Sequence, residues 1–496
     1  MLLRLGGSKK NMAKTSILKS NLVFGGAQIV QMLTIVLRAK LIAVMLGSAG
    51  MGLNAIFQSV LHIVNNVCAC GIMQSSVREI AQVNAEQNAE KLNFKIQVFR
   101  RLLCISALLG LLVCCLGAWP LSSVSLGKTS YIFSFVVLGA GTMFFTLMQG
   151  EMSILQGTRQ VKSLAIASIV GSVTSLLVCI PCYYYLQQDG VAWAIAIANF
   201  AYWLIYLYFT RRQLNTRKVK LSLRKALQEG KPMIMLGFVL MLGSFLVTLF
   251  TYLTNISIRL LGSINDVGLY QGAAAIATQS ILVVTSVLAA DFFPRLSAVG
   301  DDKKEQNKLV NEQLILVVLA VASIACVVIC FAPIIIRLLL SSDFLVVEPM
   351  LKLMATALLF RGVWIVMSYI ILSKGDRRSY FIYDGLIGNG LNFLIGIAAY
   401  YRYGLTGIGV ANVLTSLLVA GILFTIVYKK YDARLTSVSK QMLIVSIVLM
   451  ALCYVMSVCW GYWSVIGVIA TLSWSLKNLD KQYGLLASVQ RRFKHK

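Results

Sequence analysis

Nine acidic or strongly basic residues lie inside long apolar stretches of this sequence, and they have the clearest potential for chemistry. The basic ones are Arg38, Lys40, Arg259, Arg337, Lys352 and Arg361, and the acidic ones are Glu151, Asp291 and Asp384. If the stretches cross a membrane, a charge at the bilayer centre costs about 2.5–3.5 kcal/mol even on a lenient scale, so such groups usually face water or a partner. A cavity rich in cations and poor in acids attracts an anionic ligand.

The six basic residues differ in how far they lie from the ends of their apolar stretches. Arg361 lies some twelve residues from either end of its stretch, so it is the first candidate for binding an anion. Arg259 and two of the others lie within about one turn of a stretch end, where a long side chain can also reach water. Arg38 and Lys40 point about 200° apart around one helix, so only one of them is expected to face a cavity, and the sequence does not choose between them.

His62, Asp291 and Asp384 are the candidates for coupling to a proton or an ion. His62 falls in the middle of its apolar stretch, and its pKa range suits a proton-sensitive group, although packing is the simpler interpretation. Each of the two aspartates lies near one end of its stretch, close to arginines of the loops. Ion pairing with these arginines is therefore the simpler interpretation for both.

The composition shows what kind of structure must position these residues. The 496-residue chain has 45 Lys+Arg against 18 Asp+Glu, a net charge of +27, yet 58% of its residues are hydrophobic and only 13% are charged. A soluble domain carries about 25% charged residues, and a basic nucleic-acid-binding protein would carry more, so both classes are excluded. Segments of about 20 apolar residues recur, which predicts an all-α polytopic membrane protein with about 14 transmembrane helices.

Cysteines give no evidence of a metal site. The chain has eleven, all inside apolar runs, and the pair Cys179 and Cys182 lacks a second cysteine pair or a nearby histidine. We therefore expect no metal site. We also expect no cofactor and assign no catalytic residue.

Orientation follows from the loops, because Lys and Arg are retained on the cytoplasmic side. Every second connection between the predicted spans, starting with the second, lies on the same side of the membrane as the termini. These connections and the termini contain 37 of the 45 basic residues. Both termini are therefore predicted to be cytoplasmic.

The chain is partly duplicated. Residues 46–53 resemble 261–269, Arg78 matches Arg295 and 190–192 match 409–411, all at a nearly constant separation along the chain. Two six-helix lobes related as parallel repeats, with a substrate site between them, would explain this pattern. The predicted divisions are an N-terminal segment 1–19, an N-lobe 20–210, a basic cytoplasmic linker 211–232, a C-lobe 233–428, two additional helices within 441–475 and a basic tail 476–496.

Four short segments carry a family resemblance. Residues 39–43, 46–53, 267–272 and 338–344 resemble Wzx-type O-antigen and lipid-linked oligosaccharide flippases of the multidrug/oligosaccharidyl-lipid/polysaccharide exporter (MOP) superfamily. The similarity extends over about residues 12–430. It implies two lobes in a V around a cationic cavity in which Arg361, Arg259 and Lys40 are the cavity cations, with Arg38 as an additional base. The two extra C-terminal helices are similar to the layout of lipid II flippases.

The resemblance also implies an activity. A flippase of this kind moves an undecaprenyl-pyrophosphate-linked oligosaccharide, such as an O-antigen or other polysaccharide repeat unit, from the cytoplasmic to the periplasmic leaflet of a bacterial inner membrane. Its expected partners are this lipid-linked glycan, membrane lipids and polysaccharide polymerase or chain-length proteins, with no nucleic acid. The alternatives are a MATE-like drug/cation antiporter and a lipid II flippase. A polymerase or glycosyltransferase is disfavoured because every outer loop has about ten residues or fewer.

Overall fold

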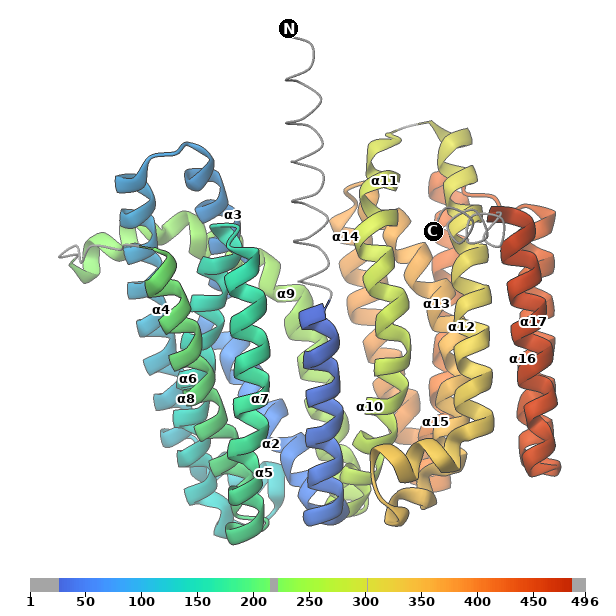
Figure 1. The fold of residues 1–496 in the computed structure, drawn as a ribbon, viewed down its shortest axis with the longest axis horizontal. Helices are drawn as coiled ribbons and strands as arrows, with labels where there is room; N and C mark the ends of the chain where they lie inside the picture. Colours follow the sequence, from blue (N-terminus) through green and yellow to red (C-terminus); the bar gives the residue numbers. More distant parts are fainter. Residues whose placement is uncertain (1–25, 215–221, 301, 484–496) are drawn as a thin grey trace, which may run out of the picture. The chain divides into compact units, whose positions relative to one another are not determined.

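The fold is helical throughout the described residues. The computed structural model describes residues 26–214, 222–300 and 302–483, and every regular element in these ranges is a helix. The all-α prediction is therefore confirmed. Contacts divide the chain into two compact units, residues 1–259 and 260–496, shown from blue to green and from yellow-green to red in Figure 1. The predicted N-terminal segment 1–19 lies outside the described residues.

The first unit starts with the helix Gly26–Met45. It continues with α2 (Gly47–Ala69), α3 (Ile72–Ala85), α4 (Ala89–Leu116), α5 (Ala118–Leu126), the short η1 (Thr129–Tyr131), α6 (Ile132–Gly157), α7 (Val161–Leu186), α8 (Gly190–Gln213) and α9 (Leu223–Leu261).

The second unit starts with α10 and ends with α17. Its elements are α10 (Ile264–Val287), η2 (Leu288–Phe292), α11 (Phe293–Ala298), α12 (Lys303–Leu339), η3 (Ser342–Val347), α13 (Glu348–Ser373), α14 (Arg377–Ser379), η4 (Tyr380–Gly388), α15 (Asn389–Tyr431), α16 (Ser437–Cys459), η5 (Gly461–Trp463) and α17 (Ser464–Tyr483).

The number of membrane-spanning helices differs from the predicted 14. In the described ranges, 11 helices are long and apolar enough to cross a membrane, or up to 12 if the bent pair α2 and α3 is one span. One difference is a matter of counting, because two predicted spans lie in the segment Arg377–Tyr431, which is counted once although the non-helical residue Gly404 divides it into two helices. The other is α17, which is not among these candidate spans.

Helix α9 packs with the first unit, although we predicted residues 233–428 to form the C-lobe. Asn66 of α2 donates a hydrogen bond to Thr248 (3.0 Å), and Asn255 donates to Ser59 of α2 (2.9 Å). At the α2–α3 bend of 52°, Gly71 approaches the backbone of Gly237 so closely that a Cβ on Gly71 would lie 2.1 Å from the Gly237 carbonyl oxygen. Polar contacts and backbone packing thus hold α9 on α2. The predicted linker 211–232 is also shorter than expected, since α9 already begins at Leu223.

The duplication predicted from sequence has a structural counterpart in one turn of each unit. Gln187, between α7 and α8, has φ 48° and ψ −125°, and Gly404 in α15 has φ 60° and ψ −148°. Three residues later, a Cβ on Gly190 would lie 2.1 Å from the carbonyl oxygen eight residues before it, and the same is true of Gly407. Both matches have the same separation along the chain, so Gly190 corresponds to Gly407, two residues away from the sequence match at 409.

Helices α16 and α17 pack on α12 through small polar side chains. Ser457 donates to the Ile329 carbonyl (3.2 Å), Ser323 donates to Ser475 (3.1 Å) and the Cys330 thiol contacts the Ser464 hydroxyl (2.8 Å). Small residues of this kind let membrane helices approach closely. The two helices extend beyond the predicted limits 441–475, so that the first residues of the predicted tail 476–496 are helical.

Candidate functional site

Two of the intramembrane charges are neutralised within their own unit. Glu151 of α6 is buried and accepts two hydrogen bonds from Arg100 of α4, from Nε at 2.9 Å and from Nη2 at 2.7 Å. Lys352 of α13 is also buried, lies 2.7 Å from Glu348 and donates to the Ser457 carbonyl of α16. Glu151 is satisfied by a bidentate ion pair, and Lys352 by an ion pair and a hydrogen bond to a backbone carbonyl. We therefore interpret both charged residues as structural.

Arg361 differs from both pairs. It lies on α13, its side chain is exposed, and its guanidinium lies 5.3 Å from the ring centroid of Trp364. Its electrostatic neighbours are Asp384 and Tyr270, and it forms no ion pair with any residue that the structure describes. A guanidinium that lies over an aromatic face does not use its N–H donors in that contact, so Arg361 can still bind an anion.

Asp384 is held beside Arg361 by two neutral donors from α13. Its Oδ1 accepts hydrogen bonds from Trp364 Nε1 and from Ser368 Oγ, each at 2.5 Å. The prediction that Asp384 meets a loop arginine is therefore not what the structure has. The carboxylate lies in η4, a π-helix of nine residues. π-Helical turns are rare and frequently occur at functional sites.

Asp291 also lies in a π-helical turn, η2, but its surroundings differ. It is 61% exposed and lies 3.0 Å from Arg295 one turn later. This is the loop-arginine pairing that the sequence suggested. Of the two aspartates, only Asp384 is partly buried and supported by neutral donors, so it is the better coupling candidate.

Arg38 lies inside the first unit. Its polar neighbours are Tyr183 and Cys179 of α7 and Tyr202 of α8. Its Nε and Nη2 atoms are buried without a hydrogen-bond partner among the described residues. Buried donors without partners are costly, so Arg38 is a second cation able to accept an anionic ligand.

The remaining predicted residues occupy three different settings. Lys40 is half-buried on the helix Gly26–Met45. His62 of α2 is exposed, with its ring edge-on to Phe145 at 5.4 Å. Arg259 of α9 donates from Nη2 to the Val124 carbonyl of α5 (2.7 Å), and this contact joins the ends of the two helices. Arg259 therefore has a structural contact that the sequence did not suggest.

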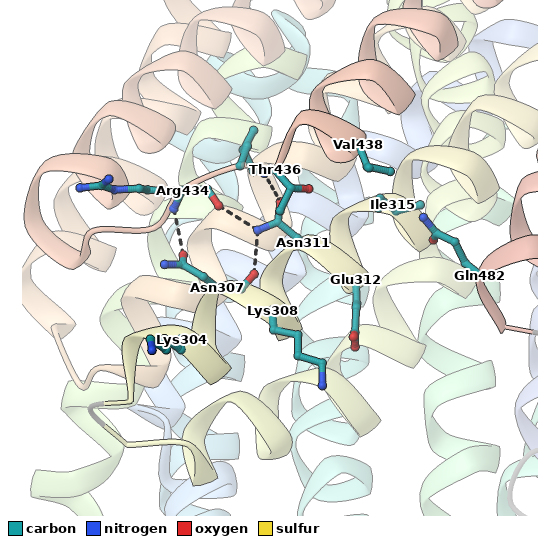
Figure 2. Close-up of a pocket in the computed structure, with 11 residues that line it drawn as sticks. Lys304, Asn307, Lys308, Asn311, Glu312, Ile315, Arg434, Thr436, Val438 and Gln482 are labelled. Atoms are coloured by element: carbon teal, nitrogen blue, oxygen red, sulfur yellow. Dashed lines mark hydrogen bonds between the residues drawn. The ribbon is translucent and has the colours of Figure 1, made fainter.

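A cavity of about 680 Å³ lies at the start of α12. Amide side chains hold the connection between α15 and α16 there, as Figure 2 shows. Asn307 accepts from the Arg434 backbone N–H (2.9 Å), and Asn311 accepts from that of Thr436 (2.8 Å) and donates to the Arg434 carbonyl (2.8 Å). The hydrogen bond from Arg434 also lowers the pKa of Asp432 below its ordinary value. In this cavity the asparagine amides are already hydrogen-bonded to the backbone.

A second cavity, of about 250 Å³, lies in the first unit and has a different lining. Its polar side chains come from α2, α3, α6 and α9, and none is charged. They are Asn65, Asn66, Gln74, Gln149, Ser153, Gln156 and Ser244. We call this cavity the amide pocket.

Sequence reasoning missed the amide pocket and the donors to Asp384. A signal for the pocket was present, because Gln149, Ser153 and Gln156 are spaced at i, i+4 and i+7 within an apolar stretch, which places them on one helix face. The partners of Asp384 had no such signal, because the π-helical register of η4 is not visible in hydropathy.

The comparisons with known proteins agree with this architecture. The model of the family described as polysaccharide biosynthesis protein matches residues 41–349, more than half of the chain. The chain belongs to this family. The Lipid III flippase of Escherichia coli K12 is 23% identical over 381 residues, which cover 74% of this chain and 88% of that protein. The Shigella flexneri Lipid III flippase matches equally well.

Solved structures show the same fold. The lipid II flippase MurJ in an inward closed conformation superposes with a TM-score of 0.71 at 14% identity and covers 93% of this chain and 99% of its own. An inward-facing MATE family multidrug transporter of the MOP superfamily gives a TM-score of 0.64 at 16% identity, covering 81% and 95%. The family match and the Lipid III flippases confirm the resemblance seen in the sequence, and the solved structures show the same fold. The names of these relatives are those of flippases and transporters.

Proposed function

We propose that this family member is a flippase that moves an undecaprenyl-pyrophosphate-linked oligosaccharide from the cytoplasmic to the periplasmic leaflet by alternating access through a cationic cavity. The observation that carries the proposal is Arg361, an exposed cation on a membrane helix without an ion pair among the described residues. The names of the Lipid III flippases and of MurJ support a lipid-linked substrate.

The pyrophosphate is the difficult part of such a substrate. Moving one carboxylate-sized ion into a medium of low dielectric constant costs roughly 20 kcal/mol in the idealised limit, and a pyrophosphate carries more than one charge. Arg361 and Arg38 offer unpaired guanidinium donors, which match phosphate oxygens in geometry. Lys40 adds a half-buried cation, and Arg259 keeps a buried Nε donor without a partner among the described residues, beside its bond from Nη2 to Val124.

Asp384 is our proposed coupling residue. Its charge lies near Arg361, so binding of a proton or a cation at Asp384 alters the local field that Arg361 presents to an anion. Its two neutral donors fix its position without neutralising it. His62 and Asp291 are the weaker candidates, because one packs against Phe145 and the other pairs with Arg295.

The setting we propose is the bacterial inner membrane, with both termini in the cytoplasm and with polysaccharide polymerase or chain-length proteins as partners. The basic loops support this orientation. A lipid II flippase is the second candidate, favoured by the MurJ fold match that extends over 93% of this chain. A MATE-like antiporter of organic cations is disfavoured by the positive charge of Arg361 and Arg38.

A flipping assay in vesicles tests the proposal. The purified chain is reconstituted with fluorescent undecaprenyl-pyrophosphate-linked oligosaccharide, and a membrane-impermeant quencher reports the leaflet. We expect protein-dependent movement that an imposed proton or sodium gradient accelerates. Movement of lipid II at a higher rate would favour the second candidate, and export of organic cations without lipid movement would contradict the proposal.

A further inference from the structure

The amide pocket of the first unit contains side chains that the fold uses and others that it does not use. Asn65 accepts a hydrogen bond from Thr146 (2.9 Å) and Asn66 donates to Thr248 (3.0 Å), so these two are partly satisfied. The carboxamides of Gln74, Gln149 and Gln156 make no hydrogen bond among the described residues. The pocket thus presents three free carboxamides, in contrast to the asparagines of Figure 2, which bind backbone.

The position of these carboxamides requires an explanation. Gln149 lies eight residues before the end of α6, about 12 Å along the axis, within a helix that is a candidate membrane span. A carboxamide that faces hydrocarbon without a partner costs several kcal/mol. Gln149, Ser153 and Gln156 share one face of α6, so the whole face is suited to water or to a polar ligand.

The chemistry of the lining indicates the ligand. Each carboxamide supplies two N–H donors and one carbonyl acceptor and carries no charge. A phosphate would be matched by cations, and none lines the pocket. Hydroxyl groups both donate and accept, so a surface of carboxamides and serines fits a polyhydroxylated neutral molecule. At about 30 Å³ per water the volume of about 250 Å³ holds roughly eight waters, which is the scale of one sugar ring.

We propose that the amide pocket binds a sugar residue of the transported glycan, separately from the cations that bind its pyrophosphate. This inference rests on the proposed function and names the part of the substrate that the first unit recognises. Gln149 and Gln156 are the specificity-determining residues, because both are free to hydrogen-bond hydroxyl groups. Glycan and pyrophosphate then contribute to affinity through different residues.

Binding to two lipids separates these contributions. The full chain in nanodiscs is titrated with undecaprenyl pyrophosphate and with the same lipid carrying a neutral trisaccharide, and the ratio of the two dissociation constants is the glycan increment. We expect the wild-type chain to bind the glycan-bearing lipid at least tenfold more tightly. The double variant Gln149→Ala/Gln156→Ala should lower this increment by about three- to tenfold per amide, with unchanged binding of undecaprenyl pyrophosphate.

Matched variants make the result interpretable. Gln188→Ala removes an exposed glutamine from the turn before α8 and should leave the increment unchanged. If the alanine variant does not fold, Gln149→Met/Gln156→Met keeps the side-chain volume and removes the hydrogen bonds. Arg361→Ala should weaken binding of both lipids by a similar factor, so the increment remains.

The outcomes distinguish the two proposals. A wild-type chain that binds both lipids equally, or a folded double variant with the wild-type increment, overturns the glycan site and leaves the flippase proposal intact. A wild-type chain that binds neither lipid overturns both.

Discussion

The two units share a backbone turn but differ in the charges at matched positions. In the register that pairs Gly190 with Gly407, Arg361 of α13 corresponds to Phe144 of α6, and Ser368 to Glu151. The first unit therefore has a carboxylate where the second unit has a serine, and this carboxylate forms an ion pair with Arg100. Unit two has a cation where unit one has a phenylalanine that packs on Phe200 and Trp203.

This difference separates charges that stabilise the fold from charges that are available to a ligand. Glu151 is 3% exposed and bidentately paired, whereas Arg361 is exposed and lies over the ring of Trp364 without an ion pair in the described part of the chain. The duplicated scaffold tolerates either arrangement at the same depth of the helix. Charge placement, more than backbone, therefore distinguishes the roles of the two units.

The largest expected effect comes from breaking the ion pair between Arg100 and Glu151. Glu151→Ala removes the carboxylate that pairs with the partly buried Arg100, which should lower the free energy of unfolding by about 3–5 kcal/mol. The double variant Arg100→Met/Glu151→Leu removes both charges and should recover most of this loss. Thermal unfolding in detergent measures both. If Glu151→Ala unfolds at the wild-type temperature, the pair is not structural.

The second prediction concerns Asp384. Asp384→Asn keeps an oxygen that accepts from Trp364 and Ser368 but removes the charge beside Arg361. We expect a folded protein whose flipping in vesicles no longer responds to an imposed gradient, with a rate roughly tenfold below that of the driven wild type, a loss equivalent to about 1.4 kcal/mol. Asp291→Asn, at the exposed pair with Arg295, is the control. A gradient response retained by Asp384→Asn and lost by Asp291→Asn would reverse our assignment.

The third prediction uses the shared turn itself. Gly404 has a backbone conformation that only glycine adopts without strain, while Gln187 occupies nearly the same conformation. Gly404→Ala should therefore destabilise the chain by about 1–3 kcal/mol, and Gln187→Gly should stabilise it by up to about 1 kcal/mol. Opposite shifts of the unfolding temperature are expected. Shifts of the same sign would mean that the two turns are not equivalent.

Much of the fold could be predicted from sequence because hydropathy and basic loops encode it directly. The division near residues 400–405 was visible and corresponds to Gly404, and the duplication was visible in a register within two residues of the structural one. The assignment of α9 was not visible, because it depends on hydrogen bonds between residues far apart in the sequence, such as Asn255 to Ser59.

The site was only partly predictable for a related reason. Depth in the membrane correctly placed Arg361 near the middle of α13, far from either helix end. Depth cannot show which cations have partners, so the sequence did not reveal that Lys352 pairs with Glu348 and Arg259 bonds Val124, while Arg361 has no ion pair among the described residues. Partner geometry is a tertiary property, and it is what distinguishes these residues.

The most direct test of the account is the flipping rate of Arg361→Ala in vesicles that contain undecaprenyl-pyrophosphate-linked oligosaccharide. Loss of charge-assisted bonds to the pyrophosphate should reduce the rate by about 10- to 100-fold or more, while Arg361→Lys should retain part of it. Arg402→Ala, at an exposed arginine of α15, should flip at the wild-type rate. A folded Arg361→Ala protein that flips the lipid as fast as the wild type would contradict the central claim.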